Sequence, residues 1–267
     1  MTIPDRIWRR YIDGLKRVDK EAGRKMFSYL AHHEWFRNNR TMQEALDYAF
    51  SLATAYGEAA TSLACEMYDA VAEASGFGAA PAMPAATASY EEVTIAMTGT
   101  KSNPNLMANA VSRLVKMAGA DTTLYNAMRD GAQFAWVPAG DTCAFCITLA
   151  SRGWQYMSKD ALKNGHAEHI HANCDCTYAI RFNESMSVKG YDPDRYAAMY
   201  FDMKGIDKSV IKKYEEEHGP ITTPKDRIRV MRRQAYKENS EKINAQKRSA
   251  YAKSKELESS SAEEIDV

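Results

Sequence analysis

The chain has 267 residues, 45% of them hydrophobic, which is enough for one large folded domain or two modest ones. Its 35 basic residues balance its 35 acidic residues, and this zero net charge argues against a protein that binds polyanions over its whole surface. No early stretch joins a basic region to a long apolar run, and no apolar window reaches the ~18 residues of a membrane span. We therefore expect neither a signal peptide nor a membrane segment.

Residues 1–130 are predicted to form a helical domain. Their first four apolar positions are spaced by four, four and three residues, which places them on one face of a helix. These positions are Ile7, Tyr11, Leu15 and Val18. The same spacing recurs over residues 46–64 and again from Leu106 onward. Between these stretches, residues 76–90 are crowded with Gly, Pro, Ala and Met, which predicts a loop.

A small module with short strands is predicted for residues 131–185. Strand patterns at 134–137 and 177–182 flank a segment that is poor in apolar residues and cannot easily build its own core. Residues 186–255 are predicted to be helical and increasingly charged. The acidic, serine-rich residues 256–267 are predicted to be disordered. The predicted fold class is therefore mainly α, with a zinc-stapled α+β module between two helical regions.

The zinc prediction rests on four of the five cysteines, which lie within 34 residues in two close pairs. Cys143-Ala-Phe-Cys146 is followed by His171-Ala-Asn-Cys174-Asp-Cys176. In a chain without an export signal, such clustering indicates metal ligation rather than disulfides. Zinc accepts tetrahedral sulfur and nitrogen donors, and four protein ligands leave no position for water. We predict one structural Zn²⁺ bound by the four cysteines, with His171 either replacing one of them or supporting the site from outside.

Two alternatives use the same segment. The cysteines could lie without a metal on a packed face, although two close pairs beside a histidine make this an uncommon arrangement. His166-Ala-Glu168 also matches the His-x-Glu half of a zinc nucleobase deaminase, with Cys143 and Cys146 as its Cys-x-x-Cys half. However, the order of the halves is reversed, no proline precedes Cys143, and two further cysteines would close the coordination sphere. We expect His166 and Glu168 to lie on a solvated linker and the protein not to be an enzyme; the alternative is a deaminase- or nuclease-like zinc enzyme acting on nucleic acid.

A family resemblance is carried by residues 129–153, RDGAQFAWVPAGDTCAFCITLASRG, and by the later His171-Ala-Asn-Cys174-Asp-Cys176. These stretches resemble the phage minor head proteins related to the head-morphogenesis F protein of phage Mu, in the form found in tailed phages and prophages of Gram-positive bacteria. The similarity is close over residues 129–182 and looser over the helical N-terminal half. Ala172 departs from the family pattern, because relatives often have proline there.

The resemblance implies a minor capsid protein of the virion, assembled in the bacterial host cytoplasm and associated with the portal vertex of the phage head. Its implied partners are the portal protein, the major capsid protein or both, and its implied role is in head assembly, DNA packaging or genome delivery. The family's presumed zinc ligands match Cys143, Cys146, His171, Cys174 and Cys176. Protease or toxin domains that are fused to some relatives have no room in this chain.

The resemblance also suggests a role for residues 222–255, in which eleven Lys or Arg against three acidic residues give a local charge of +8. A helix of this charge could contact packaged double-stranded DNA through phosphate interactions that are salt-sensitive and independent of sequence. The alternatives are a solvated charged helix and a helix that docks on an acidic protein surface. The side chains predicted to contact DNA are Arg227, Arg229, Arg232, Arg233, Lys237, Lys247 and Arg248.

Overall fold

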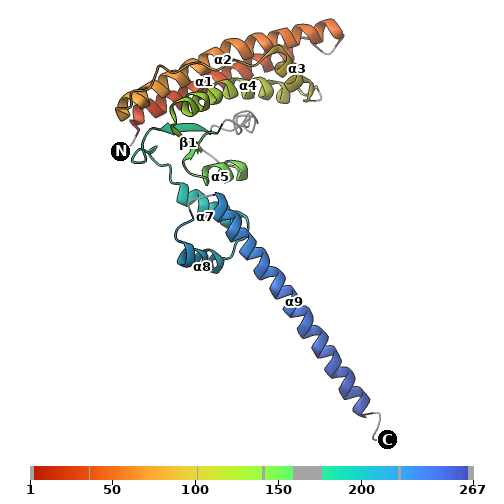
Figure 1. Cartoon of the computed structure of the whole chain (residues 1–267). Coiled ribbons are helices and arrows are strands. Elements are labelled where there is room, and N and C mark those ends of the chain that lie inside the picture. Colours follow the sequence, from red (N-terminus) through yellow and green to blue (C-terminus); the bar gives the residue numbers. More distant parts are fainter. Residues whose placement is uncertain are drawn as a thin grey trace. The chain divides into compact units, whose positions relative to one another are not determined.

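The computed structural model describes residues 3–35, 37–100, 102–139, 142–158, 176–221 and 224–263. These residues form eight helices and one three-stranded sheet, so the protein is mainly α, as predicted. The chain divides into two compact units, Met1–Ala197 and Ala198–Val267. Figure 1 labels the elements in chain order.

The first unit is built around three long helices, α1 (Asp5–His32), α2 (Asn39–Ser75) and α4 (Pro104–Asp130), which pack against one another. A short helix, α3 (Tyr90–Thr98), packs against α2 and α4. The apolar stripe predicted for α1 faces this bundle, since Tyr11 and Leu15 are buried in the core. In Figure 1, α4 lies between the other two long helices and the sheet.

Capping residues set the ends of these helices. The side chain of Asn38 accepts a hydrogen bond from the first turn of α2, and Asn103 does the same for α4, whose first residue is a proline. At the other end, Gly76 follows α2 with φ +69° and Gly131 follows α4 with φ +67°. A residue without Cβ adopts this left-handed conformation at no steric cost, and the helices therefore stop there.

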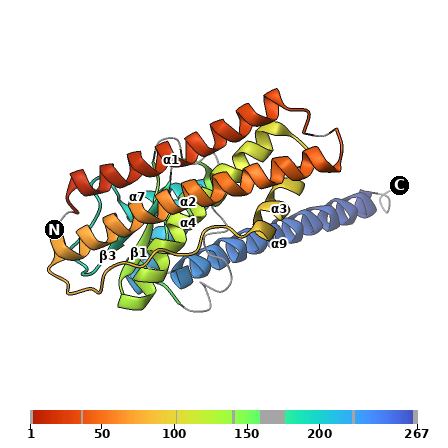
Figure 2. The same cartoon turned by 90° about the horizontal axis from the view of Figure 1, so that it is seen from above.

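The loop predicted between α2 and α3 is extended and held in place by side chains of the bundle. Asn126 accepts a hydrogen bond from Met83 N (2.9 Å) and donates one to Met83 O (2.8 Å). Arg129 donates to the carbonyls of Pro81 (3.0 Å) and Ala80 (2.8 Å). Figure 2 shows this segment running along the bundle to α3. Its backbone groups thus find partners without a strand or a helix.

The sheet has the order β2-β1-β3 and lies against the helices of the first unit. Its central strand β1 (Gln133–Val137) pairs antiparallel with β3 (Thr177–Arg181) and with the two-residue β2 (Gln155–Tyr156). A seven-residue helix, α5 (Ala144–Ala150), packs against β1. Both predicted strands are therefore confirmed to within one residue, whereas the sequence patterns predicted neither β2 nor α5.

The second unit begins within α7 (Pro193–Met203) and contains α8 (Lys208–His218) and α9 (Pro224–Glu263). Val210, Tyr214 and Val230 are buried where α8 and α9 pack together. The helix α9 continues through 256–263, most of the tail that composition predicted to be disordered. After its first residue the helix contains no Gly or Pro to end it, and the Glu, Leu and Ala residues of its last turns favour helix. Residues 264–267 lie outside the described part of the chain.

Candidate metal centre

The first cysteine pair lies at the start of α5. Cys143 is the residue before the helix, with an extended backbone (φ −73°, ψ 163°), and its side chain is exposed. Cys146 lies in the first turn and is fully buried. Residues three apart at a helix start lie on neighbouring positions of one face, so the Cys-x-x-Cys spacing directs both side chains to the same side of α5.

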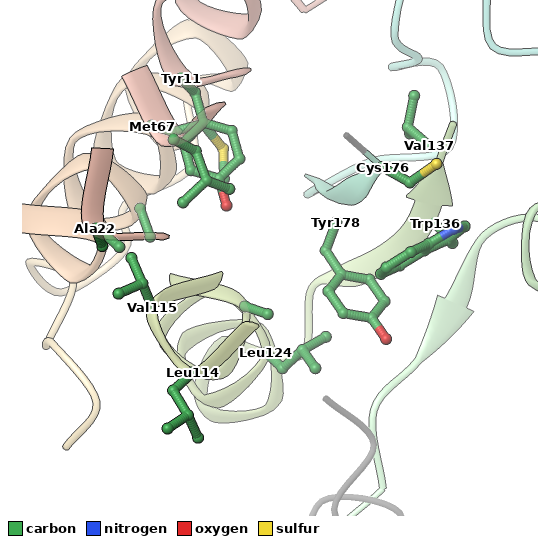
Figure 3. Packing of buried hydrophobic residues seen from close by; sticks show 14 of the residues in the cluster. Tyr11, Ala22, Met67, Leu114, Val115, Leu124, Trp136, Val137, Cys176 and Tyr178 are labelled. Carbon is green, nitrogen blue, oxygen red and sulfur yellow. The ribbon is translucent and has the colours of Figure 1, made fainter. Parts of the chain in front are cut away.

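Cys176 directly precedes β3 and is 4% exposed. Because Val137 pairs with Thr177, Cys176 lies beside the C-terminal end of β1, and Figure 3 shows it next to Val137. Cys146 and Cys176 belong to the same hydrophobic core cluster. Because α5 packs against β1 and Cys176 lies beside the end of that strand, both cysteine segments lie near β1, although thirty residues of sequence separate Cys146 from Cys176.

Two tyrosines report where these thiols lie. The pKa of Tyr178 is raised mainly by burial, with a smaller contribution from Cys146. Burial is also the main cause that raises the pKa of Tyr196, and Cys176 again adds to it. Tyr178 is the second residue of β3 and Tyr196 lies in the first turn of α7, so Cys146 lies near β3 and Cys176 lies near the start of α7.

The remaining predicted donors, His171 and Cys174, lie outside the described residues, and so do His166 and Glu168 of the deaminase alternative. In the part of the chain that the structure describes, no group of three or more His, Cys, Asp or Glu side chains is positioned to hold a metal ion. The structure therefore does not gather Cys143, Cys146 and Cys176 into such a group, and the donors predicted to join them at 171 and 174 lie outside the described residues.

Two of the three described cysteines of the predicted site have surroundings that fit a closed thiolate site, whereas the side chain of Cys143 is exposed. Cys146 and Cys176 are screened from solvent, as the thiolates of a structural zinc are. Trp136, which pairs with Tyr178 across the sheet, has a buried Nε1 without a hydrogen-bond partner among the described residues. Metal-bound sulfur commonly accepts hydrogen bonds from nearby N–H groups, and Figure 3 shows Trp136 and Cys176 at the same end of the strand pair.

Aromatic residues that were not singled out from the sequence fix the framework of this site. The rings of Trp136 and Tyr178 meet edge to face at 4.8 Å, and Tyr191 donates a hydrogen bond to the carbonyl of Ala150 (2.9 Å) at the end of α5. Tyr191 also packs edge to face on Trp154 at 5.8 Å. The alternation of aromatic and small residues in the two strands was a usable sequence signal for the first contact. No comparable sequence signal pointed to Tyr191.

Cys65, the fifth cysteine, lies apart from this region in the middle of α2. Its side chain is half-buried, and burial raises the pKa of its thiol. Neither its half-buried position nor its raised pKa gives Cys65 the exposed, ionised thiol that reactivity requires.

The seven side chains predicted to contact DNA fall into three groups. Arg227 is 7% exposed, which removes it from the side chains that a phosphate can reach. Three others form ion pairs with acidic residues of the second unit: Arg229 with Asp226 (3.6 Å), Arg233 with Glu217 (2.8 Å) and Lys237 with Asp207 (2.5 Å). The remaining three, Arg232, Lys247 and Arg248, are exposed. Counting charges along the sequence could not separate these groups, because the burial of Arg227 and the ion pairs with Glu217 and Asp207 depend on how α9 packs.

A family model described as the VG15 protein matches residues 2–203, which is more than half of the chain. No curated protein and no solved structure gives a match. The matched span contains every described cysteine and ends before α8, so α8 and α9 lie outside it. None of the described helices combines the length and the apolar character that crossing a bilayer requires. The chain therefore belongs to the VG15 protein family, a phage-like family of viral genes.

Proposed function

We propose that this protein is a structural minor capsid component of a tailed-phage head, associated with the portal vertex, and that it is not an enzyme. The observation that carries the proposal is the match to a phage-like family over residues 2–203. The resemblance of residues 129–182 to minor head proteins supplies the finer assignment to the head. The helical bundle offers a rigid body for contacts with the portal or major capsid protein.

A structural Zn²⁺ is part of this proposal. Cys143 and Cys146 would supply two ligands, Cys176 a third, and Cys174 or His171 the fourth. Such an ion would tie α5 to the start of β3, two segments that are joined through a long stretch poor in apolar residues. In finger peptides a structural zinc contributes roughly 10–16 kcal/mol of apparent binding free energy, enough to fold a module of this kind. A complete set of four protein ligands leaves no coordination site for a reacting water.

The capsid assignment is tested by expressing the full chain together with the portal protein of the same phage and purifying the portal by an affinity tag. We expect this protein to co-purify with the portal and to be present in purified phage heads by mass spectrometry. Its absence from purified heads would contradict the proposal. The enzyme alternative predicts instead that the purified, zinc-loaded protein deaminates or cleaves nucleic acid, with the rate abolished by Glu168→Gln.

A further inference from the structure

The second unit contains a groove of about 630 Å³ between α8 and α9, outside the span that the family model matches. It is lined from α8 by Ser209, Val210, Lys213 and Glu217, and from α9 by Arg232, Arg233, Tyr236 and Lys237. Four of these eight side chains are cations and one, Glu217, is acidic. The groove therefore gathers positive charge from two helices.

Two of the four cations maintain the groove rather than face a ligand. Arg233 bridges to Glu217 on α8 and lies over the ring of Tyr214 at 5.1 Å from the ring centre. Lys237 bridges to Asp207, the residue that caps the start of α8. In each of these ion pairs the positive charge is neutralised by its acidic partner, and the pairs hold α9 against α8.

The other two cations leave the groove with a net positive charge. Lys213 and Arg232 are both exposed, and neither forms an ion pair within the described residues. Tyr236 lies beside them with 78% of its surface exposed, and its hydroxyl can donate to a phosphate oxygen. The open side of the groove thus presents two cations and one hydrogen-bond donor.

The charge of the groove continues along α9. At 3.6 residues per turn, Lys225, Arg232, Tyr236 and Lys247 fall within about 60° of one another around the helix axis, and they span about 33 Å along it. We call these four residues the basic stripe; all are exposed. Its length is close to the roughly 34 Å of one DNA turn, so cations at its two ends can reach phosphates along one face of a duplex.

We propose that the α8–α9 groove and the basic stripe bind the sugar-phosphate backbone of double-stranded DNA without sequence preference. The positive charges of the basic stripe lie on one side of α9. A DNA duplex is a straight rod with regularly spaced negative charges, and it is therefore complementary to this side. An acidic protein surface would instead be expected to bury apolar residues in the centre of the contact, whereas three of the four stripe residues are cations and the fourth, Tyr236, carries a hydroxyl. The proposal does not depend on the capsid assignment, because its residues lie outside the matched family span.

The test measures binding of the full chain to a fluorescent mixed-sequence duplex by anisotropy across a series of KCl concentrations. The logarithm of the affinity should fall linearly with the logarithm of the salt concentration. The double variant Lys213→Ala/Arg232→Ala should reduce the slope of this line by about two, and Lys247→Ala by about one, since each lost phosphate contact removes close to one unit.

Lys242→Ala is the matched control. Lys242 is also an exposed lysine of α9, but it lies about 140° around the helix from Lys247, so its loss should leave the slope unchanged. An equal effect of Lys242→Ala and Lys247→Ala would overturn the proposed stripe. Undetectable binding at about 50 mM KCl, or equal affinity for polyglutamate or for a single strand, would overturn duplex DNA as the ligand. Circular dichroism of each variant verifies that α9 remains helical.

Discussion

A buried ion pair joins α1 and α4 in the bundle. Lys116 Nζ on α4 lies 2.8 Å from Asp19 Oδ2 on α1, and the two side chains are 5% and 0% exposed. Asp19 also accepts a hydrogen bond from the backbone N–H of Lys20 (2.7 Å). Placing two charges away from water is costly, and their mutual attraction offsets this cost only while both are present.

Asp19→Ala should therefore destabilise the first unit by about 3–5 kcal/mol, because it leaves the Lys116 charge buried without its carboxylate. The double variant Asp19→Ala/Lys116→Met removes both charges and should cost clearly less than the summed costs of the single variants Asp19→Ala and Lys116→Met. Urea denaturation of the four proteins measures these free energies. Additive costs would show that the two side chains do not depend on each other.

The sequence indicates one member of this ion pair but not the other. Leu15, Asp19, Ala22 and Met26 follow one helical spacing, so an aspartate stands within an otherwise apolar stripe and predicts a buried charge with a partner. The identity of that partner was not predictable. Lys116 is nearly one hundred residues away, and the apolar residues around it on α4 do not indicate which face of that helix meets α1. Periodicity locates a buried position, but only the packing of α1 on α4 selects the residue opposite.

At the scale of elements, the sequence predicted what periodicity and turn chemistry determine locally. The helices of the bundle and the strands β1 and β3 were found because their apolar spacing extends over enough residues. The helix α5 and the strand β2 were missed because they are short and stable only against β1. The extended segment after α2 was predicted as a loop, but the hydrogen bonds from Asn126 and Arg129 that hold it depend on tertiary structure.

The pairing of α8 with α9 should depend on pH through Asp207. Its hydrogen bond with Lys237, followed by the backbone N–H of Ser209, lowers the pKa of this carboxyl from 3.8 to about 2. A carboxyl whose pKa is lower in the folded state stabilises that state above its unfolded pKa, and this contribution disappears as the pH falls through the folded value. The contribution of Asp207 is therefore complete above about pH 4 and lost between about pH 4 and pH 2.

Amide chemical shifts of α8 measure this transition in the full chain. In the wild type we expect them to move towards unfolded values between about pH 4 and pH 2, whereas Asp207→Asn should weaken α8 already at neutral pH and flatten that change. Asp202→Asn, which removes an exposed carboxylate from α7, is the control. Identical titrations of the wild type and Asp207→Asn would show that another group controls the pairing.

At the scale of the whole molecule, the sequence divided the chain more finely than the structure does. The predicted helical region 1–130 and the predicted module 131–185 fall within one compact unit, because α2 and α4 pack against β3. A module that is too poor in apolar residues to fold alone can fold by adding its strands to an existing bundle. Composition showed that the segment lacked a core, but it could not show that the bundle provides one.

This arrangement determines what loss of the proposed zinc should do. Cys176→Ser removes a thiol at the start of β3, whereas α1, α2 and α4 retain their own contacts. We expect the variant to bind less than stoichiometric zinc by mass spectrometry of the metal. Hydrogen exchange should become faster in β1, α5 and β3 while the centres of the long helices stay protected, since local stability follows local contacts. Cys65→Ser, which replaces a half-buried thiol of α2 outside this region, should retain its zinc. If Cys143→Ser and Cys176→Ser both keep stoichiometric zinc and unchanged exchange, these cysteines are not ligands, and the bundle alone holds the module in place.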